Sequence, residues 1–134
     1  MKPSIILSPA DAASIRNLLD TRESHPGLPP ASRAAIDRLL TDSSACGLDE
    51  ILESHVGLYE PVTLRNPNDS SDWYRMEIVL PADADVDQDR ISLAHPMCLA
   101  ILGRRLDEAV EWDTGHGLRR MRIAEVDKAA FAFA

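Results

Sequence analysis

Apolar residues in the first third of the chain recur with the period of an α-helix. Two stretches, residues 8–22 and residues 31–45, each place large apolar side chains at i, i+3 and i+4. The positions are Ile15, Leu18 and Leu19 in the first stretch and Ile36, Leu39 and Leu40 in the second. Ser8 can cap the first helix, and Pro9 suits its first position. The pattern therefore predicts two amphipathic helices.

The segment between these helices predicts a hairpin. Residues 23–30 contain three prolines and a glycine, which cannot continue a helix. Two helices of matched length joined by a tight turn pack antiparallel, and each would be about 20 Å long. Gly47 is a plausible end for the second helix, so we assign the hairpin to residues 1–47. Because neither apolar stripe is wide, the hairpin is expected to lean on the rest of the protein.

Beyond Gly57 the period changes from about 3.6 to about 2, which is typical of strands. Apolar residues alternate with polar neighbours in about five short segments, separated by turn sequences at 66–72, 81–89 and 113–117. The alternating positions are Val62 and Leu64; Tyr74, Met76, Ile78 and Leu80; Ile91 and Leu93; Val110 and Trp112; Met121 and Ile123. Most neighbouring segments are close enough in sequence to pair antiparallel.

One short helix interrupts these strands. It is predicted over residues 96–102, begun by Pro96 and ended by Gly103. Strands packed under one short helix make an α+β domain, which we assign to residues 48–134. The predicted fold class is therefore α+β, with a short N-terminal antiparallel helical hairpin followed by an antiparallel sheet domain with one short helix.

Composition and charge narrow the classes of function. The chain has 134 residues and a formal net charge of −8, whereas direct binding to nucleic acid needs a basic surface. Its one basic concentration, Arg119, Arg120 and Arg122, is expected to be balanced by the local acids Glu111 and Asp113. Two cysteines cannot build a disulfide framework and fit a reducing cytosol. No apolar run approaches the ~20 residues of a membrane span, and no signal peptide is recognised, so a cytoplasmic protein is expected.

Acidic residues at every second position from 83 to 89 superficially resemble a calcium loop. Counted from Asp83, the sixth position should be glycine and is Gln88, and the twelfth should be glutamate and is Ala94. A solvated acidic turn is the expected structure. The histidines and cysteines also lack the paired spacings of zinc sites. We expect no metal and no cofactor.

His95 and Cys98 lie three positions apart and could form a reactive pair. A nucleophilic thiol needs an orienting third group and an electropositive setting. Cys98 instead falls on the apolar side of the short helix, where cysteine is usually a small buried hydrophobe. His95 precedes the helix at an exposed, cap-like position. No catalytic residue is expected.

The ordered motifs of the second part resemble the C-terminal domain of the GreA/GreB family of bacterial transcript-cleavage factors. The stretch ISLAHPMCLAILGRRLDEAVEW (91–112) carries the family hallmark, and IVLPADAD (78–85) matches the preceding strand and acidic loop. The matching hallmark positions are Ile91, Ser92, Pro96, Ala100, Leu102, Gly103, Arg104, Arg105 and Glu108. The stretches 3–20 and 62–82 are similar to the short members of this family, the regulators of nucleoside diphosphate kinase (Rnk).

The resemblance implies an FKBP-like domain that docks on RNA polymerase at the rim of its secondary channel. In this family the loop entering the short helix is an attachment point, which falls here on His95, Pro96 and Met97, with Pro96 and Met97 as apolar anchors. Two positions depart from the family pattern. The serine before the proline is replaced by His95, and a following glycine is replaced by Cys98.

The hairpin departs further from the family. In Gre factors a long coiled-coil hairpin enters the channel and presents acidic tip residues that help to hold a catalytic magnesium ion. This hairpin is roughly half as long or less, and its tip offers only Asp20 and Glu23. We therefore expect a non-enzymatic transcription regulator that binds RNA polymerase and competes with Gre factors without stimulating transcript cleavage.

Three alternatives stay open. The first is an FKBP-type peptidyl-prolyl isomerase, although two Trp, two Tyr and two Phe make an aromatic-lined pocket hard to build. The second is a protein-binding module whose partner is not polymerase. The third is a thiol or metal sensor that uses His95 and Cys98.

Overall fold

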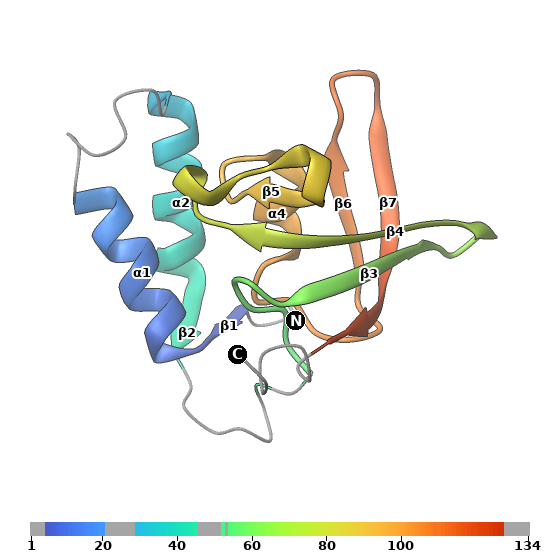
Figure 1. Cartoon of the computed structure of the whole chain (residues 1–134), viewed down its shortest axis with the longest axis horizontal. Coiled ribbons are helices and arrows are strands. Elements are labelled where there is room, and N and C mark those ends of the chain that lie inside the picture. Colours follow the sequence, from blue (N-terminus) through green and yellow to red (C-terminus); the bar gives the residue numbers. More distant parts are fainter. Residues whose placement is uncertain (1–4, 21–28, 46–51, 53, 128–134) are drawn as a thin grey trace.

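The computed structural model describes residues 5–20, 29–45, 52 and 54–127. Helices α1 (Pro9–Asp20) and α2 (Pro30–Asp42) lie side by side and run in opposite directions, which confirms the predicted hairpin (Figure 1). The Oγ of Ser8 accepts a hydrogen bond from the Asp11 N–H at 3.1 Å and caps α1 as expected. No helix of the described residues is long and apolar enough to cross a membrane.

The second helix ends earlier than predicted, and its last expected turn is a strand. The hydroxyl of Ser43 donates to the Leu40 carbonyl at 2.7 Å, and the chain then extends into β2 (Ser43–Ala45). This strand pairs in parallel with β1 (Ile5–Leu7), so Ile5 lies opposite Ser43. The pattern of apolar residues did not predict either strand. The expected stop at Gly47 lies outside the described residues.

The second part of the chain forms a five-stranded sheet in the order β5-β4-β3-β7-β6. Its strands are β3 (Pro61–Asn66), β4 (Asp69–Val79), β5 (Arg90–Ser92), β6 (Ala109–Asp113) and β7 (Leu118–Val126). Three pairings are antiparallel, but β5 pairs in parallel with β4, with Ile78 opposite Ile91. The α+β class is confirmed, and this parallel edge departs from the expected antiparallel sheet. The two short 3₁₀ turns η2 (Pro81–Asp83) and η3 (Val86–Gln88) return the chain so that β5 runs beside β4 in the same direction.

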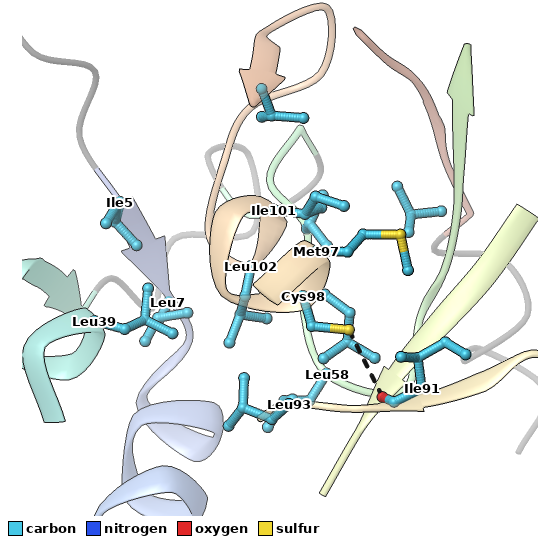
Figure 2. Close-up of a cluster of buried hydrophobic side chains, with 14 of the residues drawn as sticks. Ile5, Leu7, Leu39, Leu58, Ile91, Leu93, Met97, Cys98, Ile101 and Leu102 are labelled. Carbon is cyan, nitrogen blue, oxygen red and sulfur yellow. Dashed lines mark hydrogen bonds between the residues drawn. The ribbon is translucent and has the colours of Figure 1, made fainter. Parts of the chain in front are cut away.

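Helix α4 (Pro96–Ile101) packs with the sheet in the core of the molecule. A single cluster of buried apolar side chains joins residues of α4, the sheet and both helices of the hairpin. Ile15 and Ile36 are fully buried in it together with Ile78, Ile101 and Ile123. Figure 2 shows Leu7 and Leu39 pointing toward Leu102 of this cluster. The hairpin therefore leans on the rest of the protein, as its narrow apolar stripes predicted.

Candidate docking site

The loop between β5 and α4 presents two exposed side chains on a buried base. His95 and Pro96 are exposed, whereas Met97, the next residue, keeps only 8% of its surface exposed. The burial of Met97 does not fit its expected part as an apolar anchor, because its side chain packs in the core beside Ile101. In Figure 2 Met97 lies on the core side of α4. His95 and Pro96 are thus the residues of this loop that a partner can contact.

Hydrogen bonds from three consecutive backbone N–H groups hold the loop where it leaves β5. On the strand side, the Leu93 N–H donates to the Val79 carbonyl at 2.8 Å, and the Ala94 N–H donates to the Ser92 Oγ at 3.1 Å. The His95 N–H then donates to the Ser92 carbonyl at 2.9 Å. Ser92 was not singled out from the sequence as a residue of this site. A serine two residues before a bend is a recognised turn former, and this signal could have identified it.

The side chain of His95 caps the helix. Its Nδ1 accepts a hydrogen bond from the Met97 N–H at 3.0 Å, which satisfies one of the free donors of the first turn. An imidazole nitrogen accepts only when it carries no proton, so this bond fixes the tautomer of His95. Pro96 occupies the first helical position, where its missing N–H costs nothing. The loop therefore places both exposed side chains in one defined geometry.

Cys98 belongs to the core and not to a reactive site. Its side chain is fully buried, and its Sγ lies 3.8 Å from the Ile91 carbonyl oxygen (Figure 2). Burial raises the pKa of the Cys98 thiol to about 12, so the thiolate that a nucleophile or metal ligand requires is suppressed. The ring nitrogen of His95 bonds the backbone instead. The prediction of a buried structural cysteine is confirmed.

Gly103 follows α4 and connects this helix to β1, the strand that precedes the hairpin. Its carbonyl accepts from the Ile6 N–H of β1, and its N–H donates to the Val56 carbonyl, both at 2.9 Å. Its φ is +79°, and a Cβ atom at this position would lie 2.4 Å from Cγ2 of Ile5. Glycine is needed here for both reasons. Asp11 of α1 makes a second connection, because its Oδ2 accepts from the Leu58 N–H at 3.1 Å. No sequence signal points to this contact across 47 positions.

The acidic loop holds its carboxylates in local hydrogen bonds. The Tyr59 hydroxyl donates to Asp83, and the Tyr74 hydroxyl donates to Asp89 at 3.1 Å. Burial, followed by these bonds, raises the pKa of both tyrosines. Asp85 caps η3 by accepting from the Asp87 N–H. Among the described residues, no group of three or more His, Cys, Asp or Glu side chains could hold a metal ion.

The two predicted tip residues of the hairpin do not come together in a described site. Asp20 is the last residue of α1 and is exposed to solvent. Glu23 lies outside the described residues. The participation of these two acids in binding a partner stays a prediction.

Comparison with known proteins relates the sheet domain to transcription factors. The family described as "Transcription elongation factor, GreA/GreB, C-term" matches residues 52–128. Over 117 residues the chain is 28% identical to a "Regulator of nucleoside diphosphate kinase" of Escherichia coli, which covers 87% of this chain and 83% of that protein. Over 131 residues it is 26% identical to a "Transcription elongation factor GreA" of Caulobacter vibrioides, which covers 94% of this chain and 83% of that protein.

Solved structures give the same result for the fold. The chain superposes with a TM-score of 0.73 on "Prokaryotic transcription elongation factor GreA/GreB from Nitrosomonas europaea" at 27% identity. The alignment covers 92% of this chain and 99% of that structure. The transcription factor Gfh1 superposes with a TM-score of 0.51 at 21% identity, which indicates a shared fold. The chain therefore shares its fold with these proteins.

Proposed function

The chain belongs to the GreA/GreB transcription elongation factor family, and from this membership we propose that it is a regulator that binds RNA polymerase in the cytoplasm. It attaches near the rim of the secondary channel through His95 and Pro96. It competes there with Gre factors and does not stimulate transcript cleavage. The family consists of regulatory factors. In this proposal the chain itself catalyses no reaction.

The observation that carries the proposal is the hydrogen-bonded loop between β5 and α4, which we call the docking loop. His95 and Pro96 are exposed, while the residues directly beneath them, Met97 and Cys98, are buried. A loop already held in its binding geometry loses little conformational entropy when a partner binds. A proline at its tip reduces that loss further, because its φ is fixed in the free protein. The loop thus has the properties of an attachment point.

The length of the hairpin supports binding without cleavage. Helix α1 has 12 residues and α2 has 13, so the helices span about 18 Å and about 20 Å at a rise of 1.5 Å per residue. The Gre-type mechanism requires a hairpin long enough to carry acidic residues from the channel rim to the polymerase active site. Helices of this length fall short of such a distance.

Competition for core RNA polymerase tests the attachment. Labelled wild-type protein is expected to bind core polymerase at low salt and to be displaced by unlabelled GreA. Pro96→Asp is expected to weaken binding about tenfold or more, because it places a charge where an apolar contact forms. Aspartate is well tolerated in the first turn of a helix, so this variant should fold.

Pro30→Asp is the matched control, because Pro30 is an exposed proline that also begins a helix. Binding of this control should equal that of the wild type. Unchanged binding of Pro96→Asp, or failure of the wild-type protein to bind core polymerase, would contradict the proposal. If unrelated proteins displaced the labelled protein from core polymerase as well as GreA does, the binding would be non-specific and the partner would have to be a different protein.

A cleavage assay tests the second half of the proposal. Added to backtracked elongation complexes, the protein should release no short RNA and should reduce the cleavage that GreA stimulates. RNA release above the background of polymerase alone would show that the hairpin acts like that of a Gre factor. Peptidyl-prolyl isomerase activity gains no support from the fold, because Met97, Cys98 and Ile101 of α4 bury their side chains in the core that it shares with the sheet.

A further inference from the structure

We propose that the outer face of the sheet is a second docking surface, which binds an acidic segment of a partner protein. The surface consists of Arg65, Trp73 and Arg122, and we call it the outer arginine surface. It lies on the face of the sheet opposite to the buried cluster, away from α4 and the docking loop. It can therefore be occupied while His95 and Pro96 are bound elsewhere.

Strand register places the three side chains in one row. Arg65 of β3 is paired with Trp73 of β4 on one side and with Arg122 of β7 on the other. Directly paired residues of antiparallel strands project from the same face of a sheet. The flanking residues Leu64 and Ile123 are buried, which assigns Arg65 and Arg122 to the opposite, solvent-facing side.

The two arginines of this surface have no carboxylate partner among residues 5–20, 29–45, 52 and 54–127. Three neighbouring arginines have one: Arg75 pairs with Asp127 at 2.8 Å, Arg119 with Asp72 at 2.8 Å, and Arg120 with Glu111 at 3.9 Å. In the part of the chain that the structure describes, no carboxylate oxygen lies within 4.0 Å of Arg65 or Arg122. Both side chains are exposed.

Like charges directly opposite each other on two strands repel and destabilise the sheet. Arg65 and Arg122 stand in this relation in a chain whose formal net charge is −8. An acidic side chain inserted between them would remove the repulsion. The complementary charge of the occupant is therefore negative, and none of the described carboxylates supplies it.

A recess beside the two arginines offers space for such a side chain. It has a volume of about 470 Å³ and is formed at the turn between β3 and β4. Its lining consists of Arg65, Asn66, Pro67, Asn68, Asp69, Ser70 and Arg122. The one acid among them, Asp69, is engaged locally, because its Oδ1 accepts from the backbone N–H and the hydroxyl of Ser71. The recess thus combines two free cations with several neutral polar groups.

Trp73 indicates a protein as the occupant. Its side chain is 56% exposed, an unusual state for the largest apolar side chain in a protein. Tryptophan and arginine are the residues most enriched among those that dominate protein–protein binding energies. A long nucleic acid would need many phosphate contacts, and the remaining acidic surface would repel it. An acidic segment that also carries apolar side chains satisfies both the arginines and Trp73.

Binding of a synthetic peptide by the full chain tests this proposal. The probe is a short fluorescein-labelled peptide of alternating Glu and Leu, followed by fluorescence polarisation at low ionic strength. Wild-type protein should bind it, and raising the ionic strength from about 0.05 M to about 0.5 M should weaken binding several-fold. Arg122→Glu should weaken binding about tenfold or more, and Trp73→Ala should weaken it at both ionic strengths.

Arg122→Glu has the advantage that it places opposite charges across from each other on β3 and β7. Its melting temperature should equal or exceed that of the wild type, so a loss of binding is not a loss of folding. The control carries Arg16→Gln together with Arg38→Gln, which changes the net charge by the same amount at two exposed helix positions. The control should bind like the wild type.

Four results would overturn the proposal. Wild-type protein that does not bind the peptide would do so, as would equal losses of binding in Arg122→Glu and in the control. Tighter binding of a single-stranded oligonucleotide than of the peptide would assign the surface to nucleic acid. Self-association that disappears in Arg122→Glu would assign it to a second copy of this chain.

Discussion

Helix α4 and the α1–α2 hairpin are held in the molecule in different ways. Helix α4 has six residues, and half of them, Met97, Cys98 and Ile101, are buried. Helix α1 buries three of its 12 residues and α2 buries two of its 13. The short helix is fixed by the core, whereas the hairpin buries a smaller share of its residues there and is also held at its end, by β1, β2 and the contacts of Gly103 and Asp11. The loop that carries the exposed His95 and Pro96 is built on the first kind of support.

The largest expected effect breaks the connection between the two regions. Gly103→Ala forces a left-handed φ on alanine and drives its Cβ into Ile5. We expect the free energy of unfolding to fall by about 2–5 kcal/mol, the sum of the backbone strain and the displaced contact. Urea denaturation followed by circular dichroism measures this loss.

Gly115→Ala separates the two causes of that loss. Gly115 also has a left-handed φ, of +88°, but nothing lies within 4 Å of a Cβ atom at this position. The control should lose only the backbone part, about 1–2 kcal/mol. Equal losses in the two variants would show that the close approach to Ile5 adds no cost at position 103.

A smaller effect sharpens the description of α4 as part of the core. Since the pKa of the buried Cys98 thiol is about 12 in the folded protein and near 9 when exposed, unfolding releases a proton between these values. The contribution of this thiol to the free energy of unfolding is fully present below pH ~9. It falls as the pH rises toward 12, by up to about 1.4 kcal/mol per pH unit. Tyr59 and Tyr74 contribute in the same direction, because their pKa values are also raised.

Cys98→Ala isolates the part that belongs to the thiol. Urea denaturation of both proteins from pH 8 upward should give a shallower alkaline decline for the variant, although it is less stable than the wild type at pH 8. Parallel declines would mean that the thiol ionises as easily in the folded protein as in the unfolded chain.

The smallest effect compares the caps of the two regions. His95→Ala removes the acceptor for the Met97 N–H, and Ser8→Ala removes the acceptor for the Asp11 N–H. Each should lower the free energy of unfolding by about 1 kcal/mol. Only His95→Ala should also weaken binding to core polymerase, because only that cap shapes the docking loop. If both variants bound core polymerase equally well, the His95 cap would have no role in that binding.

Periodicity was enough to locate α1, α2 and the five strands of the large sheet, and Pro96 and Gly103 located α4. It missed β1 because Ile5, Ile6 and Leu7 show no alternation, and it extended α2 through Ser43–Ala45. These three-residue strands exist only because they pair with each other across almost forty positions. The direction of β5 depends on the path of the preceding turns, which apolar spacing does not encode.

The candidate site was predicted in part. Cap chemistry gave the exposure of His95, and the apolar spacing of the short helix gave the burial of Cys98. The burial of Met97 depends on how the first turn of α4 meets the core, which three-dimensional packing decides. The expected balance of the basic cluster was half right. Arg120 does pair with Glu111, but Arg119 pairs with Asp72 on a distant strand, and Arg122 pairs with no described acid.

The hydrogen bond between Ile6 and Gly103 has a consequence for how the protein is made. The hairpin leaves the ribosome before the sheet, and its partner glycine and the core beneath it are synthesised almost a hundred residues later. Helices of 12 and 13 residues are marginally stable in isolation. We therefore expect α1 and α2 of the nascent chain to stay unfolded until the last strands of the sheet emerge, so that these helices become protected from proteases no earlier than the sheet that is synthesised after them.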